Sequence, residues 1–388
     1  MGFDYTTCFL LLGGIIKCLA FHHFHLSVLE NRNFCDKMNY MELNWNSYTP
    51  AKEATVITTI DTHAAGEPLR IVTSGLPPLP GNTILEKRRY MQQHLDYIRK
   101  ALMWEPRGHR DMYGCILTEP VTPEADLGVL FIHNEGYSTM CGHGTIALVT
   151  ALVETGAIAA QAPQTLVNLD TPAGLVQAIA QLDSSGHVDS VSFRNVPSFL
   201  FARDIELDVP AYGRLTVDVA FGGAFYAFLP AAQIGLSIKL QHANQLAAAG
   251  DTITKAVNAV LPAKHPIEDD LSFLYGTIFT GPPEDSAHHS RNVCIFADAQ
   301  VDRSPTGTGV SARLALHNAK GEIRDNQQII IESILGAAST FTGRVVGQSK
   351  VGEYDAIIPE VSGKAYITGR HEFILDPRDQ LGQGFILF

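Results

Sequence analysis

Hydrophobic and polar residues alternate in short segments along most of this chain, and helical spacing is confined to a few places. β-branched and aromatic residues predict strands in five segments: residues 55–59, 128–133, 215–220, 272–279 and 293–296. Glycine and proline interrupt the pattern between these segments, as they do at turns. We therefore expect a protein built mainly of short strands, with few helices.

Two long segments have the spacing of amphipathic helices. One covers residues 242–261. The other covers residues 86–103, where apolar side chains recur at intervals of four, three and four residues: Met91, Leu95, Ile98 and Leu102. A third segment, residues 146–153, is apolar on almost all sides. That pattern indicates a helix buried on every side, as when a curved sheet wraps around it.

A short glycine-rich sequence occurs twice and is the most informative pattern in the chain. Residues 140–145 read MCGHGT and residues 304–309 read SPTGTG, and each copy runs directly into a helix-like stretch. The first copy has Cys141 where the second has Thr306. The repetition predicts two similar α/β halves whose helix N-termini face one site.

Cys141 is a candidate base or nucleophile because it precedes a helix. Unpaired N–H groups and the positive end of the helix dipole attract an anion and favour a thiolate over a thiol. Such a position lowers a cysteine pKa of ~8.5 by roughly one to several units. A lone cysteine before a helix is also consistent with a small buried apolar residue. The two glycine-flanked copies favour the functional interpretation.

Six further motifs, in a fixed order, make the chain from about residue 60 to its C-terminus resemble the proline racemase family: residues 61–68, 106–109, 111–114, 170–174, 221–226 and 302–305. This family includes 4-hydroxyproline epimerases and trans-3-hydroxy-L-proline dehydratases. The resemblance implies an α/β (α+β) protein with a diaminopimelate-epimerase-like fold. In that fold two pseudo-symmetric halves each consist of a curved, mainly antiparallel sheet around a central helix.

The expected halves meet near residues 198–203. Residues 51–200 together with 372–388 form the N-terminal half, which carries Cys141, and residues 201–371 form the C-terminal half, which carries Thr306. The return of the last strand to the first half is taken from the resemblance.

The pairing of Cys141 with Thr306 resembles the pattern of the dehydratases in the family, whereas racemases and epimerases have cysteine in both turns. Inverting Cα requires an acid on the face opposite the base, and a threonine hydroxyl is too weak an acid for this role. Eliminating water needs only one α-proton removed. The expected activity is therefore the cofactor-independent conversion of trans-3-hydroxy-L-proline to Δ2- and then Δ1-pyrroline-2-carboxylate.

Stereochemistry places the leaving group beside the base. In trans-3-hydroxy-L-proline the Cα hydrogen and the C3 hydroxyl share one ring face, because the carboxylate and the hydroxyl lie on opposite faces. We hypothesise that Cys141 removes the α-proton as a thiolate. The departing hydroxyl is then protonated by the resulting thiol or by His143.

Substrate binding is expected at the two helix ends. Backbone N–H groups there suit the substrate carboxylate and the developing negative charge: those of Gly142, His143, Gly307 and Thr308. By resemblance, Asp302 and the His143 side chain bind the ring ammonium, although an aspartate at this place is also typical of turns and helix caps. Three residues of family-like motifs are expected to be structural: His63, Arg107 and His109.

Composition excludes several classes of function. The 388 residues, 46% of them hydrophobic, suffice for two ordinary cores, and the net charge of −12 disfavours nucleic acid and anionic membranes as partners. The six cysteines have no C-x-x-C spacing, so neither a zinc site nor a disulfide framework is expected. No nucleotide or HExxH motif occurs, and the proposed chemistry needs no metal or cofactor. A free catalytic thiol favours a reducing, cytoplasmic location, and the resemblance implies a homodimer.

The N-terminus does not fit this enzyme. Residues 9–16 form an apolar run that has the length of a signal h-region but is too short to span a bilayer. Asp4 precedes it without any basic residue, and no clear cleavage site follows. We expect residues 1–50 to be an extension outside the fold, and we favour an over-extended gene model as its origin.

Two rival functions stay open at this point. One is a proline racemase or 4-hydroxyproline 2-epimerase, against which Thr306 argues. The other is a non-catalytic paralogue that binds an imino acid, against which the intact Cys141, His143 and Asp302 argue.

Overall fold

The computed structural model describes residues 47–387, and the chain divides into one unit ending at Ala51 and a second unit that begins at Lys52. Every helix and strand given below belongs to the second unit. The expected extension, residues 1–50, lies almost wholly outside the described residues, as do three of the cysteines: Cys8, Cys18 and Cys35.

The first half of the second unit contains eight strands and three helices before the chain crosses over. Its elements are β1 (Thr55–Ala64), β2 (Glu67–Ser74), α2 (Ile84–His94), α3 (Asp96–Met103), β3 (Tyr113–Thr118), β4 (Leu127–His133), β5 (Tyr137–Ser138), α4 (Gly142–Glu154), β6 (Gln164–Thr171), β7 (Gly174–Leu182) and β8 (Val188–Arg194). In hydrogen-bonding order the sheet runs β1, β2, β3, β4, β6, β7, β8, with β5 paired to β4.

The second half repeats this plan. Its elements are β9 (Ser198–Val209), β10 (Gly213–Phe221), β11 (Phe225–Pro230), α5 (Ala243–Val260), β12 (Leu274–Gly281), β13 (Ser290–Phe296), β14 (Gln300–Val301), α6 (Gly307–Ala319), β15 (Ile329–Ser333), β16 (Gly336–Val351) and β17 (Tyr354–Gly363). Short 3₁₀ turns lie at Ala231–Ile234, Leu240–His242 and Asp269–Leu271. The last strand is β18 (Ala365–Leu375).

Matching strand pairs reveal the pseudo-symmetry. Each half has two parallel pairs within an otherwise antiparallel sheet, β2–β3 and β4–β6 in the first and β11–β12 and β13–β15 in the second. Each half also places its central helix directly after a two-residue strand, α4 after β5 and α6 after β14. The expected architecture of two similar halves, each a mainly antiparallel sheet with a central helix, is confirmed.

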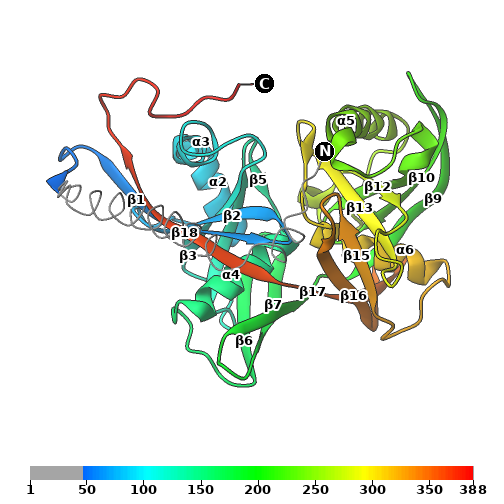
Figure 1. Ribbon diagram of the computed structural model, residues 1–388, viewed down its shortest axis with the longest axis horizontal. Helices are drawn as coiled ribbons and strands as arrows, with labels where there is room; N and C mark the ends of the chain where they lie inside the picture. Colours follow the sequence, from blue (N-terminus) through cyan, green and yellow to red (C-terminus); the bar gives the residue numbers. More distant parts are fainter. Residues whose placement is uncertain (1–46, 388) are drawn as a thin grey trace, which may run out of the picture. The chain divides into compact units, whose positions relative to one another are not determined.

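The two central helices are buried because they are apolar on nearly all sides. Residues 142–153 of α4 and residues 307–316 of α6 are all buried. Helix α4 packs against β1, β2, β7, β8, β17 and β18, and α6 packs against β9, β10, β11, β16 and β17. Figure 1 shows each helix with the strands of its own half. The prediction of a helix wrapped by a curved sheet is confirmed for residues 146–153.

The predicted strands and the helix at residues 242–261 correspond to β1, β4, β10, β12, β13 and α5. The single helix expected at residues 86–103 is wrong, because the chain breaks at Leu95 (φ −128°, ψ 13°) into α2 and α3. The Arg99 guanidinium bonds Asp96 and the carbonyl oxygens of His133 and Asn134, which anchors α3 to the end of β4. Apolar spacing continues across the break, so the sequence pattern did not reveal it.

The last strand joins the first half earlier than expected. β18 pairs with β1 from Ala365↔Ala64 to Leu375↔Thr55, so residues 365–371, expected in the second half, pair with the first. This strand ends at Leu375 and does not extend to residue 388. The chain passes between halves at residues 195–197, after which β9, like β8, pairs with β17. No helix among the described residues is long and apolar enough to cross a membrane.

Candidate active site

Two helix N-termini meet at the centre of the candidate site, at Gly142 of α4 and Gly307 of α6. A Cβ atom placed on Gly142 would lie 2.5 Å from the Cα of Gly307, and one placed on Gly307 would lie 2.7 Å from the Cα of Gly142. Distances this short leave no room for a side chain, so the close approach requires glycine at both positions. The repeated glycine-rich motif therefore forms two helix ends in direct contact.

Cys141 is the N-cap residue of α4. Its extended backbone (φ −141°, ψ 118°) directs the sulfur back over the first turn, where Sγ accepts a hydrogen bond of 3.3 Å from the N–H of Gly144. The side chain is buried, with 5% of its surface exposed. Nδ1 of His143 lies 3.2 Å from Sγ. Two polar groups, the N–H of Gly144 and the imidazole of His143, thus contact one buried thiol.

The pKa of Cys141 departs from the sequence-based expectation. Burial raises the pKa of this thiol well above its usual value, and the carboxylates of Asp302 and Glu67 add to the effect. The N–H of Gly144 and the Tyr113 hydroxyl act in the opposite direction. The expectation of a lowered pKa is therefore wrong, because desolvation of the thiolate outweighs stabilisation by one helix end.

His143 has a defined orientation beside the thiol. The ring packs edge-on against the Tyr113 ring, with centroids 4.7 Å apart, and its Nδ1 and Nε2 lie 3.2 and 3.8 Å from Cys141 Sγ. Burial lowers the pKa of His143, although the Asp302 carboxylate opposes the shift. A neutral imidazole at this distance is able to accept the Cys141 proton. Cys141 and His143 together form a buried thiol–imidazole pair.

Thr306 occupies the corresponding place before α6 in a different conformation. Its φ of 64° is rare for a β-branched residue and costs on the order of 1–3 kcal/mol. The Thr306 N–H donates to Ser304 Oγ at 3.0 Å, and its hydroxyl donates to Asp302 Oδ2 at 2.7 Å. Asp302 Oδ1 accepts the N–H of Ser304 at 2.7 Å. Both oxygens of the Asp302 carboxylate are therefore fixed by the turn.

The helix ends offer backbone donors. In the part of the chain that the structure describes, five first-turn N–H groups have no acceptor in the protein: those of Gly142, His143, Gly307, Thr308 and Gly309. The Thr308 side chain is bound to the Tyr226 hydroxyl at 2.6 Å. An anion between the helix ends would meet these N–H groups and the positive ends of two helix dipoles.

The structure brings all seven residues named from the sequence into one region, and it adds others that the sequence reasoning missed. Glu67 is buried, and its Oε2 accepts the backbone N–H of Arg303 at 2.7 Å across the two halves. Burial raises the pKa of Glu67, and the nearby Asp302 carboxylate adds to the shift. Glu67 and Tyr113 lie within family-like motifs, which was a usable signal. Ser138 Oγ accepts the Tyr113 hydroxyl and lies 3.1 Å from the Tyr275 hydroxyl. Nothing local in the sequence indicated Ser138 or Tyr275.

Residues expected to be structural make hydrogen bonds within the fold. Arg107 donates to the carbonyl oxygens of Gly382 at 3.0 Å and Ile374 at 2.9 Å. His63 Nδ1 accepts the N–H of Gly66, and His109 Nδ1 lies 2.7 Å from the carbonyl of Arg110. Within the described region, none of these three side chains makes a hydrogen bond or ion pair with Cys141 or Thr306.

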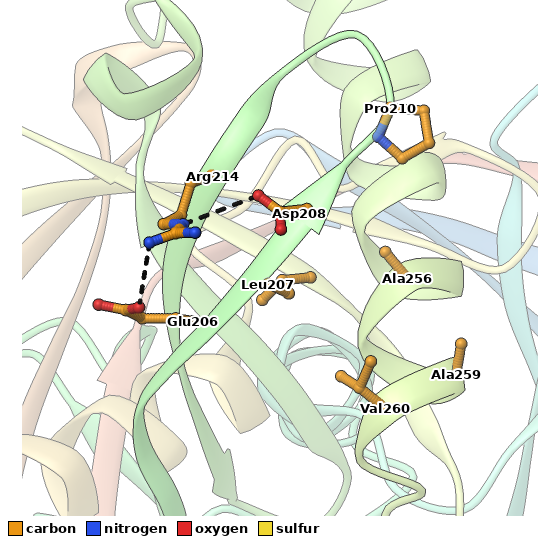
Figure 2. A pocket seen from close by; sticks show the side chains of 8 residues that line it. All are labelled: Glu206, Leu207, Asp208, Pro210, Arg214, Ala256, Ala259 and Val260. Atoms are coloured by element: carbon orange, nitrogen blue, oxygen red, sulfur yellow. Dashed lines mark ion pairs between the residues drawn. The ribbon is translucent and has the colours of Figure 1, made fainter.

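A groove on the surface lies away from this cluster. Figure 2 shows it between the β9–β10 hairpin and α5, with Arg214 pairing Glu206 and Asp208 at 3.9 and 3.7 Å. All three charged side chains are more than two-thirds exposed, so their ion pairs are weak. Over residues 47–387, no group of three or more His, Cys, Asp or Glu side chains is arranged to hold a metal ion.

Comparisons with known proteins find relatives over most of the chain. The family model described as proline racemase matches residues 59–386. A Xenopus tropicalis protein named trans-L-3-hydroxyproline dehydratase is 48% identical over 341 residues, which are 87% of this chain and 97% of the relative. A Burkholderia multivorans protein named 3-hydroxyproline 2-epimerase is 46% identical over 331 residues, 85% of this chain and 98% of the relative.

Among solved structures, a hydroxyproline epimerase from Agrobacterium vitis with bound trans-4-hydroxy-L-proline superposes with a TM-score of 0.80 at 32% identity. The match covers 86% of this chain and 95% of that one.

Proposed function

The chain belongs to the proline racemase family, and we propose that within it this protein is a trans-3-hydroxy-L-proline dehydratase. The observation that carries the proposal is the unequal pair at the helix ends, with a thiol at Cys141 and a hydroxyl at Thr306 that is bound to Asp302. The dehydratase activity named for the Xenopus tropicalis relative supports it.

Cys141 is the proposed base. Its proton passes to His143, whose Nδ1 is 3.2 Å away, and the Asp302 carboxylate favours the imidazolium that results. A bound ring ammonium adds positive charge near the sulfur and favours the thiolate, which opposes the effect of burial on the thiol pKa. The thiolate then takes the α-proton of the substrate.

The helix ends are the proposed carboxylate site. Removing the α-proton pushes charge towards the carboxylate, and the unpaired N–H groups of Gly142, His143, Gly307 and Thr308 are placed to bind that charge. Asp302 is the proposed partner of the ring ammonium, since Ser304 and Thr306 hold its carboxylate in one orientation.

Elimination follows from removal of the α-proton. The electron pair of the Cα–H bond forms the Cα=C3 double bond, and the C3–O bond breaks. The oxygen takes one proton and leaves as water, for which the thiol of Cys141 and His143 are the donors suggested by sequence. The product is Δ2-pyrroline-2-carboxylate, which tautomerises to the Δ1 imine. No atom beyond those of substrate and protein is required.

The second candidate is an epimerase acting on a hydroxyproline, which the name of the Burkholderia multivorans relative favours. That reaction requires a proton donor on the Thr306 side. The Thr306 hydroxyl is a far weaker acid than a thiol, and in this site it donates to a carboxylate.

Location and assembly are also proposed. The three cysteines within the described range are free, namely Cys115, Cys141 and Cys294, which suits a reducing cytoplasm. A homodimer remains a prediction from the family, and light scattering of the purified protein measures it.

A direct assay tests the proposed function. The full chain is incubated with trans-3-hydroxy-L-proline, and o-aminobenzaldehyde traps any Δ1-pyrroline-2-carboxylate formed. L-Proline and trans-4-hydroxy-L-proline are incubated in parallel and separated by chiral chromatography. We expect pyrroline without inverted products. Inverted imino acid in the absence of pyrroline would contradict the proposal.

A further inference from the structure

Three hydroxyl groups form a chain that begins at Tyr113, beside the pair of Cys141 and His143, and crosses to the other half. The Tyr113 hydroxyl donates to Ser138 Oγ at 2.5 Å, and Ser138 Oγ lies 3.1 Å from the Tyr275 hydroxyl. Tyr113 and Ser138 are 3% and 2% exposed. Tyr113 begins β3, Ser138 ends β5, and Tyr275 comes from β12 of the second half.

Tyr113 places the start of this chain beside the thiol. Its ring packs against His143 and His133, with centroids 4.7 and 5.6 Å away, and Nδ1 of His143 lies 3.2 Å from Cys141 Sγ. The Tyr113 hydroxyl also acts to lower the pKa of Cys141. The far end is held as firmly, because the Tyr275 ring stacks on Phe296 with centroids 5.3 Å apart. The phenol of Tyr113 is therefore positioned by aromatic packing.

The proposed reaction needs a proton donor at this place. Hydroxide is a poor leaving group, so the C3 oxygen must receive a proton as its bond to carbon breaks. In trans-3-hydroxy-L-proline that oxygen is on the same ring face as the α-hydrogen and one carbon away. A hydroxyl beside the base is therefore the candidate donor to the leaving oxygen.

We propose that Tyr113 is the general acid of the dehydration, with Ser138 and Tyr275 as the chain that stabilises its phenolate. This proposal rests on the dehydratase function. The Cys141 thiolate takes the α-proton, and the Tyr113 O–H bond breaks as its proton joins the C3 oxygen, which leaves as water. The proton on the Cys141 thiol then passes to the Tyr113 phenolate. Thiolate and phenol are both restored, and the α-proton of the substrate has replaced the one that left with water.

The hydroxyl chain makes loss of a proton from a buried phenol feasible. When Tyr113 becomes a phenolate, the Ser138 hydroxyl rotates to donate a hydrogen bond to it and accepts a hydrogen bond from the Tyr275 hydroxyl. The two hydrogen bonds in series stabilise the negative charge. Burial raises the pKa of Tyr113 well above its usual value, with the Cys141 and Tyr275 charges adding to it. The group is consequently protonated at neutral pH before the reaction, as an acid must be.

Deuterium exchange at Cα distinguishes loss of the general acid from loss of the base. Tyr113→Phe keeps the ring and removes the hydroxyl, and the full chain is assayed in D₂O with trans-3-hydroxy-L-proline. If Tyr113 is the acid, Cys141 still removes the α-proton, but the carbanion returns to substrate more often than it eliminates. We expect pyrroline formation to fall about 10²-fold or more, and deuterium to accumulate at Cα of the recovered substrate.

Matched variants complete the test. Ser138→Ala and Tyr275→Phe should give smaller losses with the same rise in the ratio of exchange to elimination. Tyr137→Phe removes another partly buried phenol, which bonds Asp96 at 3.0 Å, and should leave both rates unchanged. Parallel loss of exchange and elimination in Tyr113→Phe, or loss of neither, would overturn the proposal. Absence of pyrroline with the unmodified protein would count against the dehydratase function instead.

Discussion

The hydroxyl of Thr306 donates to Asp302 Oδ2 at 2.7 Å, at the place where racemases and epimerases of this family carry a second cysteine. Thr306 thereby orients the carboxylate proposed to bind the ring ammonium. We therefore propose that Thr306 positions Asp302, in addition to leaving this side of the site without a strong acid.

Thr306→Val should weaken substrate binding. The substitution keeps the β-branched shape and removes the hydrogen bond to the carboxylate, which is worth about 1.5–3 kcal/mol for a charged acceptor. We expect KM to rise roughly tenfold or more, with a smaller change in kcat. Thr306→Ser, which restores the hydroxyl, is the control and should retain a near-normal KM. Equal KM values for the valine and serine variants would show that the bond to Asp302 is not used.

Thr306→Cys should introduce epimerase activity. The new thiol supplies the acid that is missing on the second face, so hydroxyproline or proline should invert slowly, as measured by chiral chromatography. Cys294 lies close to this turn, since its carbonyl accepts the N–H of Asp302 at 3.0 Å, so the new thiol would have a cysteine nearby. The double variant with Cys294→Ala prevents oxidation between the two. No inversion in either variant would mean that a second thiol is insufficient.

Cys141→Ser should abolish turnover without unfolding the protein. A serine hydroxyl is a far weaker acid than a thiol, so it rarely forms the anion that would act as the base. We therefore expect kcat to fall by at least about 10³-fold, within the range of acid–base catalysis. Circular dichroism and the melting temperature provide the control for folding. Near-full activity of the serine variant would remove Cys141 from the mechanism.

Glu67→Gln should change the pH dependence of stability. Burial raises the pKa of Glu67 in the folded protein above its unfolded value of about 4.5, so the protonated form is the one the fold favours. Its stabilising contribution is fully present below pH ~4.5 and is lost as pH rises through the folded pKa. Glutamine carries no charge at any pH.

The measurement is the free energy of unfolding by urea at several pH values between 4 and 8. Relative to the unmodified protein, Glu67→Gln should gain stability as pH rises from about 4.5. In the unmodified protein Glu67 ionises more readily in the unfolded chain than in the fold, whereas glutamine does not ionise in either state. A difference between the two proteins that is constant with pH would contradict the raised pKa.

Local patterns in the sequence were sufficient for the five predicted strands, for α5 and for the buried α4, because each depends on residues close in sequence. They failed at Leu95, where the break in the helix depends on Arg99 reaching carbonyl oxygens at the end of β4. The extent of β18 was also misjudged. Its residues are mostly exposed on both faces, including the polar Arg370, His371 and Glu372, so the alternation of buried apolar and exposed polar residues that marks a strand is weak there.

The site could be assembled from motifs only in part. The two glycine-rich turns identified Cys141 and Thr306, and family-like motifs contained Glu67 and Tyr113. The direction of the Cys141 pKa required knowledge of burial and of two carboxylates, Asp302 and Glu67, which are distant in sequence. Tyr275 joins the hydroxyl chain from the opposite half, so no local pattern points to it.

The contact between Gly142 and Gly307 sets the width of the site with main-chain atoms alone. Because two backbones already touch, substitutions in the surrounding walls can alter which ring fits without altering the spacing of the two helix ends. Replacing a single side chain, such as cysteine by threonine, can then change the chemistry at one face while the distance between the two helix ends stays constant. A larger residue at either glycine would instead push the helix ends apart and change that distance for every substrate at once.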